Sequence, residues 1–138
     1  RYVGAAPAFH DLEMVEAYLR DVHAPFGDLS DEEWKHLATT SAIPNGKGAF
    51  QLHYDPAIAD VFTAGPVEDI NLWSVWDRIS CPVLVLRGEN SDLLSAETAT
   101  EMSTRGPRAT VKTIKNCGHA PALMDQDQVK MVVDWLEN

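Results

Sequence analysis

Hydrophobic and polar positions follow two different spacings in the second half of the chain, and together they predict a strand–helix–strand unit. Residues 83–86 form a continuous apolar run, which is typical of a strand buried on both faces. Residues 111–115 alternate between apolar and polar, which favours a strand with one wet face. A helix near residues 96–105, with Ser95 as its N-cap, would join them. Strands connected in this way should be adjacent and parallel, with a right-handed crossover.

Apolar residues recur every three or four positions in other stretches, and this spacing predicts further helices. Two of these stretches begin with residues that resemble a capping box, which stabilises a first helical turn. The predicted helices cover residues 11–22, the stretch opened by Ser30 and Glu33, a turn or two within 55–63, residues 71–79, and the stretch after Asp125. We expect the last helix to pack against the sheet with an apolar stripe made of Val129, Val132, Val133 and Leu136.

The first half of the chain contains one hairpin signal. Residues 44–48, Pro-Asn-Gly-Lys-Gly, are a strong turn sequence. The alternating residues 50–54 that follow predict a short strand, which would pair with residues 39–43. Residues 1–9 show no pattern, and we expect a loop there.

A linker signal at Gly65-Pro66 divides the chain into two predicted parts. Residues 1–66 should form a helical segment with a small hairpin. Residues 67–138 should form the parallel βαβ unit with a helix before it and one after it. The predicted fold class is therefore α/β, and 138 residues suffice for one modest domain with its own core.

The charge balance narrows the range of partners. The formal net charge is −10 and no cluster of Lys and Arg is present, which argues against a nucleic acid or an anionic membrane as partner. No apolar run approaches the ~18 residues of a membrane-spanning helix. The N-terminal stretch lacks both the apolar core of a signal peptide and an initiator Met, so we expect a piece of a longer or processed protein.

The chain has two cysteines, Cys81 and Cys117. If the two strands run parallel, these residues lie at opposite ends of the pair, roughly 20 Å apart, which is far beyond disulfide reach. Two reduced thiols fit a cytoplasmic protein. Neither cysteine has the spacing of a metal site, and the histidines are scattered along the sequence, so we expect no metal and no cofactor.

Asp92 and His119 each follow the C-terminal end of a predicted strand. Parallel strands bring these ends to one edge of a sheet, where open α/β sheets place their chemistry. Alone, such an Asp is usually a solvated loop residue and such a His a structural one. Together they fit acyl transfer, because a catalytic imidazole needs a carboxylate at Nδ1 to fix its tautomer and stabilise the imidazolium. Trp34 is expected to be a core or interface residue, with a place in a substrate pocket as the alternative.

The stretches CPVLVLRGENSD and NCGHAPALM resemble the C-terminal part of the α/β-hydrolase fold. In that family a strand ending in Gly precedes the acid, and a Gly-His dipeptide after the last strand carries the general base. The resemblance implies that Asp92, after Gly88, is the orienting acid, and that His119, after Gly118, is the general base. It also implies that residues 9–66 are the cap segment inserted into the core.

The chain departs from that family in one large respect, because it contains no G-x-S-x-G nucleophile elbow. The first core strand also has one predicted neighbour only, which leaves its other edge and its apolar faces bare. We therefore expect the chain not to be a compact monomer on its own. A missing N-terminal half, a second copy of the chain or a swapped element would cover the open side.

Three functions remain open at this level. The first is hydrolysis of small, fairly apolar ester-like substrates, with His119 and Asp92 supplied by this chain and the nucleophile supplied from elsewhere. The second is a non-catalytic fragment or interaction module that associates through its open strand edge. The third keeps the fold but cleaves carbon–halogen or carbon–carbon bonds.

Overall fold

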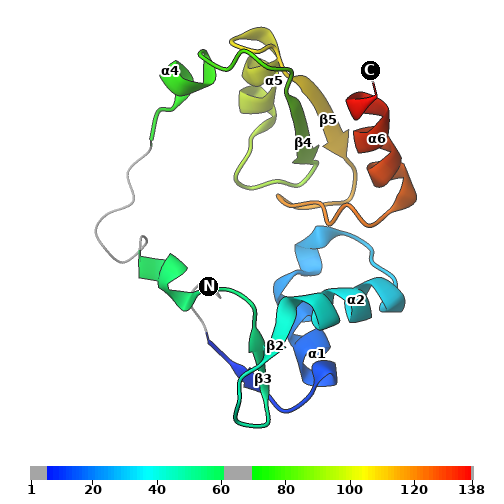
Figure 1. Ribbon diagram of the computed structural model, residues 1–138. Helices are drawn as coiled ribbons and strands as arrows, with labels where there is room; N and C mark the ends of the chain where they lie inside the picture. The colour runs from blue at the N-terminus through cyan, green and yellow to red at the C-terminus, as the bar shows by residue number, and fades with distance from the viewer. Residues whose placement is uncertain (1–5, 61–69, 138) are drawn as a thin grey trace. The chain divides into compact units, whose positions relative to one another are not determined.

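The computed structural model describes residues 6–60 and 70–137, which divide into two compact units (Figure 1). The first unit contains residues 6–24 and 30–60, and the second contains residues 25–29 and 70–137. The predicted linker at Gly65-Pro66 lies outside the described residues. The assignment of a cap and a core to the two parts of the chain stays a prediction.

Two packed helices form the centre of the first unit: α1 (Leu12–Val22) and α2 (Asp31–Ser41). Both start where the sequence predicts. Asp11 caps α1 by accepting the Met14 N–H at 2.8 Å, and Ser30 forms a full capping box with α2. The apolar side chains that are buried in this unit are Phe9, Val15, Leu19, Trp34 and Ala38.

The first unit also contains a three-stranded antiparallel sheet in the order β1 (Ala8–Phe9), β3 (Phe50–Leu52), β2 (Ala42–Pro44). The predicted hairpin is confirmed, because β2 pairs with β3, but its first strand begins at Ala42 and not at residue 39, since residues 39–41 still belong to α2. The predicted loop at residues 1–9 is wrong for β1, which pairs with β3 through two residues only. A two-residue strand is too short to show a periodicity, so its pairing depends on contacts with the distant hairpin. A 3₁₀ turn, η2 (Pro56–Ala59), follows the hairpin.

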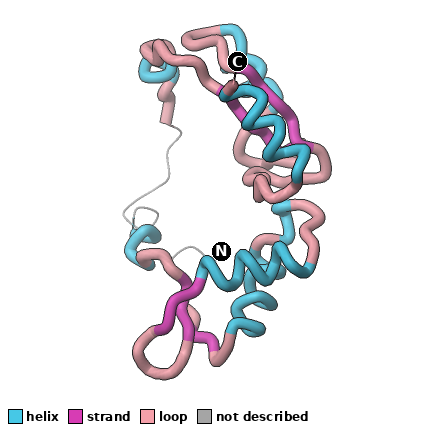
Figure 2. The backbone as a smooth tube through the Cα atoms, turned by 45° about the vertical axis from the view of Figure 1, so that its right-hand side comes forward, coloured by secondary structure: helices cyan, strands magenta, loops and turns pink. Residues whose placement is uncertain are grey.

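The second unit is built on two parallel strands, β4 (Leu84–Gly88) and β5 (Thr110–Ile114), as the spacing predicts (Figures 1 and 2). Helix α5 (Ala96–Thr104) connects them and is capped by Ser95, also as predicted. The register aligns Leu84 with Thr110 and Gly88 with Ile114. Both strands therefore end level with each other, and the loops that follow them start at the same edge.

The burial of this unit differs from the prediction in two places. Residues 84–87 of β4 are half-buried rather than enclosed on both faces, and only Gly88 is fully buried. Helix α6 (Gln126–Leu136) runs beside the sheet but has no fully buried residue (Figure 1). Its Val129, Val133 and Leu136 side chains are 45%, 42% and 69% exposed. The described residues lack a layer that would cover these apolar surfaces.

Asp125 caps α6 by accepting the N–H groups of Asp127 and Gln128. The predicted capping box is only half formed, because the Gln128 side chain instead accepts the Leu123 N–H at 3.1 Å.

A cluster around Arg105 fastens the segment before β4 to the end of α5. Helix α4 (Trp73–Trp76) is shorter than the predicted 71–79. The Arg105 guanidinium donates twice to the Asp77 carboxylate, at 2.8 and 2.6 Å, and lies 4.7 Å above the Trp73 ring. These hydrogen bonds from Arg105 lower the pKa of Asp77. The contacts hold the chain in place just before it enters the sheet.

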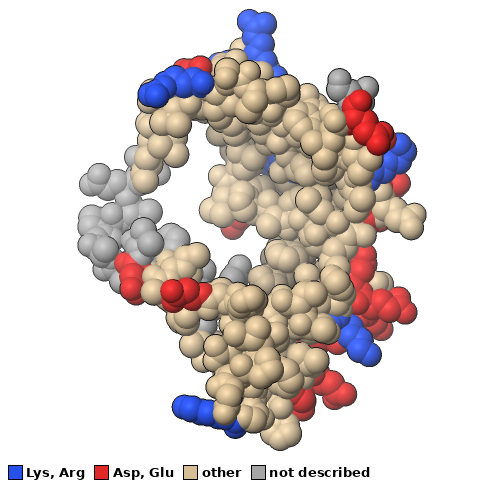
Figure 3. Space-filling model, viewed as in Figure 1, with Lys and Arg blue, Asp and Glu red and all other residues tan. Residues whose placement is uncertain are grey.

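The two cysteines are both free, as predicted, with Cys81 exposed and Cys117 buried. Burial raises the pKa of the Cys117 thiol, which makes it a poor nucleophile. None of the helices in the described ranges is long and apolar enough to cross a bilayer. Figure 3 shows acidic and basic side chains interspersed on the face in view, and the basic ones do not form one continuous patch.

Candidate active site

The candidate site lies where β4 and β5 end. Gly88 closes β4, and the next residue continues the ladder, since the Glu89 N–H donates to the Ile114 carbonyl at 2.7 Å. One step on, the Asn90 N–H donates to the Cys117 carbonyl at 2.9 Å. The loop after β4 is therefore bonded directly to the loop after β5, two residues before His119.

Gly88 allows this close approach. A Cβ at position 88 would overlap the Gly118 carbonyl oxygen and would lie 2.7 Å from the Cys117 carbonyl oxygen. Both obstacles are backbone atoms, which cannot swing aside as a side chain can. A strand that ends in glycine thus lets the His-bearing loop fold over the end of β4.

The His119 imidazole meets Ser91 in this arrangement. Nδ1 of His119 lies 3.0 Å from Ser91 Oγ. The same oxygen accepts the Leu94 N–H at 2.9 Å, so its position is fixed by its own loop. A second bond supports that loop, because Arg87 Nε donates to the Leu94 carbonyl at 2.7 Å. When Nδ1 carries the proton, Ser91 Oγ accepts a hydrogen bond from Nδ1–H, and this tautomer leaves Nε2 unprotonated and able to act as a base.

Asp92, the predicted partner of His119, lies next to Ser91 on the loop after β4. It forms no hydrogen bond with the imidazole. Its side chain is exposed and makes no hydrogen bond or ion pair with any residue of the described ranges. Ser91, which the sequence interpretation missed, takes the position at Nδ1. The only available signal was that a hydroxyl residue directly precedes the predicted acid. The roles of Asp92 and His119 in chemistry remain a proposal.

Glu89, the other carboxylate close to the end of β4, has a different position. Its Oε2 accepts the Asn116 N–H at 3.2 Å. Asn116 has a φ of 53°, in the left-handed region, so this bond holds a turn that the backbone resists. Glu89 therefore shapes the loop that leads to His119.

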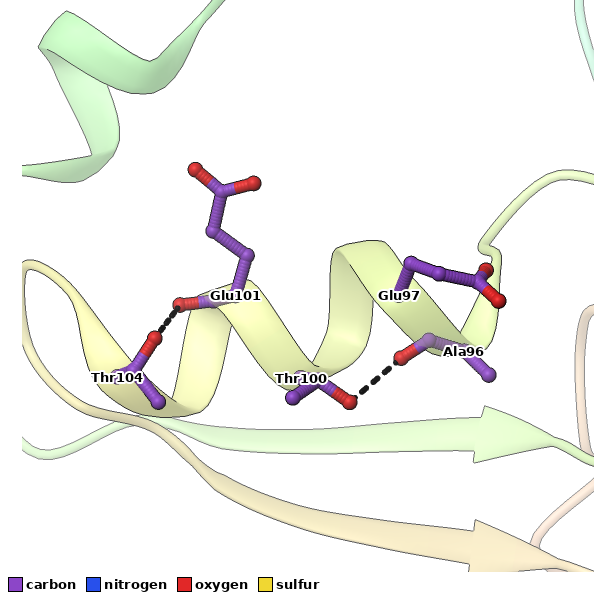
Figure 4. Close-up of a pocket in the computed structure, with 5 residues that line it drawn as sticks. All are labelled: Ala96, Glu97, Thr100, Glu101 and Thr104. Atoms are coloured by element: carbon purple, nitrogen blue, oxygen red, sulfur yellow. Dashed lines mark hydrogen bonds between the residues drawn. The ribbon is translucent and has the colours of Figure 1, made fainter.

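A hollow of about 450 Å³ lies elsewhere, along the outer face of α5 (Figure 4). Its hydroxyls are already used: the Thr100 hydroxyl donates to the Ala96 carbonyl at 2.8 Å, and the Thr104 hydroxyl to the Glu101 carbonyl at 3.1 Å. Glu101 Oε1 accepts from Arg105 at 2.6 Å. We assign it no role, because a helix face whose hydroxyls bond to its own backbone has few groups left for a ligand.

The metal-ligand and Trp34 possibilities raised by the sequence concern other residues. Within the described ranges, no group of three or more His, Cys, Asp and Glu residues could hold a metal ion. Trp34 is 6% exposed, and Arg20 lies 5.5 Å from the centroid of its ring. Trp34 is thus a core residue of the first unit, as expected, and the pocket-lining alternative stays untested.

Comparison with known proteins gives these features a context. No protein-family model matches the chain. The chain is 36% identical over 136 residues to the 3-hydroxybutyrate-oligomer hydrolase of Cupriavidus necator, a match that covers 93% of this chain and 46% of that protein. The crystal structure of an α/β-hydrolase from Novosphingobium aromaticivorans is similar with a TM-score of 0.82 and 30% identity, over 99% of this chain and 49% of the other.

A crystal structure of a Rickettsia typhi protein is similar with a TM-score of 0.85 and 32% identity, over 99% of this chain and 46% of the other. These similarities and the parallel β4–β5 pair show that the chain belongs to the α/β-hydrolase superfamily, of whose fold it forms a part. The chain spans about half the length of the relatives that it matches.

Proposed function

We propose that the chain is the His- and acid-bearing part of a hydrolase that cleaves small, fairly apolar esters by acyl transfer. The observation that carries the proposal is the parallel β4–β5 pair, whose end brings the loop of Asp92 to the loop of His119. Ser91 Oγ lies 3.0 Å from His119 Nδ1, so one ring nitrogen is held and the other is available. Superfamily membership supports the reaction class, and two unpaired cysteines support a cytoplasmic location.

In the proposed mechanism, His119 acts through Nε2. It takes the proton of a nucleophile that lies outside this chain, while that nucleophile attacks the ester carbonyl carbon. The protonated imidazole then gives the proton to the leaving alkoxide. Water hydrolyses the acyl-enzyme in a second step, with His119 again as base.

Asp92 is the proposed orienting acid. A serine hydroxyl can fix the imidazole tautomer, but it is neutral and stabilises an imidazolium less than a carboxylate does. For Asp92 to reach Nδ1, the short loop after Gly88 has to rearrange and release Ser91 from the ring. Asp92 is exposed and makes no bond in the described ranges that would have to break for this movement.

The substrate class takes its support from the name of one relative. The Cupriavidus necator protein is named for the hydrolysis of 3-hydroxybutyrate oligomers. Such oligomers are linked by esters between a carboxyl group and a secondary hydroxyl, which fits the proposed acyl transfer. We infer short oligoesters of this kind as the substrate class.

The substrate can be tested with the completed enzyme, by which we mean this chain joined to the nucleophile-bearing half that precedes it in an α/β-hydrolase. We expect the completed enzyme to hydrolyse a 3-hydroxybutyrate trimer and p-nitrophenyl butyrate, and the chain alone to hydrolyse neither above background. The reason is that a base and an acid without a nucleophile cannot form an acyl-enzyme. Product release would be followed by chromatography and absorbance. Cleavage of the p-nitrophenyl ester without cleavage of the trimer would reject the oligoester but keep the reaction class.

The proposed partner of the chain is that nucleophile-bearing half, seated on the open edge of β4. The Thr110 N–H donates to the Val83 carbonyl, and the Glu89 N–H donates to the Ile114 carbonyl. In a parallel pair, the backbone N–H and C=O groups of alternate residues point to opposite neighbours of the strand. The backbone groups of the odd-numbered residues of β4 therefore point to β5, and those of the even-numbered Leu84 and Leu86 point to the open edge. The exposed apolar stripe of α6 supports a partner of this kind. The same surfaces favour the second candidate function, a non-catalytic interaction module.

Amide hydrogen exchange can show whether the partner on this edge is the nucleophile-bearing half or a second copy of the chain. In the chain alone at low concentration, we expect the amides of Leu84 and Leu86 to exchange fast, and those of Val85 and Arg87, bonded to β5, to exchange slowly. Addition of the nucleophile-bearing half should slow Leu84 and Leu86 by about 10²-fold or more, because a ladder bond opens only with the sheet. If both amides instead become protected as the chain is concentrated by itself, the partner is a second copy.

A further inference from the structure

A five-residue segment, Pro25–Leu29, lies against the loop that carries His119. It belongs to the second unit, although the residues on either side of it in the sequence belong to the first. Its main contact is a backbone hydrogen bond of 2.6 Å from the Gly118 N–H to the Pro25 carbonyl. Gly118 immediately precedes His119, so the bond fixes the Cys117–Gly118 peptide group, one residue before the histidine.

The packing around this bond is close. A Cβ at Gly118 would lie 2.7 Å from Pro25 Cβ and 2.9 Å from the Pro25 carbonyl oxygen. Gly27 has a φ of +106°, and a Cβ there would lie 3.6 Å from the Asn116 carbonyl oxygen and 3.9 Å from Cys117 Cβ. Gly118 therefore lets the segment and the loop meet backbone to backbone, whereas at Gly27 the positive φ, and not a lack of space, favours glycine. Cys117 is 2% exposed beneath this contact.

The opposite side of the same loop rests on the end of β4. There the Asn90 N–H donates to the Cys117 carbonyl at 2.9 Å, and the Gly118 carbonyl lies directly over Gly88. Residues 117 and 118 are thus held between the loop after β4 on one side and the segment on the other. The His119 side chain is exposed, and within the described ranges its ring has one hydrogen-bond partner, Ser91.

We propose that Pro25–Leu29 is a positioning segment for His119, which acts by clamping the Cys117–Gly118 peptide group against the loop that follows β4. This role rests on the proposed function of His119 as the general base. An exposed ring with one neutral partner gains little order from its own contacts, so its placement depends on the backbone that carries it. A displacement of about 1 Å at a reacting group can cost roughly 10²-fold in rate. Loosening the segment should therefore lower kcat more than it raises KM.

Gly27→Ala tests the proposal against a matched control, Gly46→Ala. Both glycines have positive φ values, +106° and +74°, but a Cβ at Gly46 would meet no atom within 4 Å. The two variants thus carry a backbone penalty of the same kind, and only one of them affects the segment. In the chain, we expect Gly27→Ala to speed exchange of the Gly118 amide about tenfold or more and to shift the His119 ring Hε1 signal. We expect Gly46→Ala to change neither.

The amide of Val85, in the β4–β5 ladder, reports whether the second unit is still folded. If Gly27→Ala also exposes Val85, Pro25→Gly replaces it as the test, because it keeps the carbonyl acceptor but loosens its backbone. The proposal is overturned if the folded variant keeps Gly118 protected and leaves the His119 signal unchanged. It is also overturned if Gly46→Ala produces the same changes.

In the completed enzyme, Gly27→Ala should lower kcat by about 10- to 100-fold, with KM changed less than threefold. Equal kcat values for Gly27→Ala and the unsubstituted enzyme would overturn the proposal. An inactive unsubstituted enzyme would instead reject the proposed function. The exchange and ring-signal measurements on the chain would then still decide whether the segment positions the loop.

Discussion

Replacing His119 by alanine in the completed enzyme is expected to reduce kcat for p-nitrophenyl butyrate by roughly 10²- to 10⁴-fold, the usual contribution of a general acid–base group. KM should change little, because the imidazole acts on the proton of the nucleophile and is not expected to bind the apolar part of the ester. Initial rates at saturating and limiting substrate concentrations separate the two constants. The structural basis is that one ring nitrogen, Nδ1, lies 3.0 Å from Ser91 Oγ, so that Nε2 is left for catalysis.

A matched control is His36→Ala, which removes an exposed imidazole from α2 in the first unit. We expect its kcat to stay within about twofold of the unsubstituted enzyme, since substitution of an exposed side chain that makes no hydrogen bond or ion pair in the described ranges usually has little effect. Near-full turnover in His119→Ala would reject the hydrolase interpretation of this chain. A large loss in both variants would show that the enzyme, rather than the site, had been damaged.

The second large effect is expected for Asp92→Asn. The loss of the carboxylate removes the charge that stabilises the imidazolium and favours the wrong tautomer, which cost roughly 10⁴-fold in a well-studied triad. The control is Glu89→Gln, an equally conservative change in the same loop. Its amide keeps an oxygen that can accept the Asn116 N–H, so we expect turnover to fall by less than about fivefold. The measured quantity is kcat/KM as a function of pH.

Ser91→Ala distinguishes two accounts of the same site. If Asp92 takes over Nδ1 during turnover, the loss of the Ser91 hydroxyl should cost much less than Asp92→Asn. If Ser91→Ala is the more severe change and Asp92→Asn stays near full activity, the observed contact is the working one and Asp92 is not the orienting group. If Glu89→Gln alone abolishes turnover, Glu89 is the acid.

The βαβ unit could be predicted from the sequence because its signals are local. The apolar run before Gly88, the alternation before Asn116 and the Ser95 cap each specify one element. Their connection length then specifies parallel pairing, which the structure confirms. Placing Asp92 and His119 at one edge follows from that pairing and needs no side-chain detail.

The rest of the site depends on contacts between residues distant in sequence. The choice of Ser91 at Nδ1 is decided by how one loop folds over another, and adjacent residues in a loop carry no periodicity that could separate them. The bond between Gly118 and Pro25 joins two segments that are 93 residues apart in the sequence. The half-buried β4 and the exposed stripe of α6 show a second limit. An apolar pattern predicts that a surface should be buried, but it does not predict which part of a protein covers that surface.

Complementation between separate halves tests the central claim most directly, namely that this chain supplies the base and the acid while another half supplies the nucleophile. The chain and the nucleophile-bearing half would be purified apart, mixed in equal amounts and assayed with p-nitrophenyl butyrate. We predict that neither half alone exceeds background, that the mixture hydrolyses the ester, and that a chain with His119→Ala restores no activity. Turnover by the nucleophile-bearing half alone that equals the turnover of the mixture would contradict the claim.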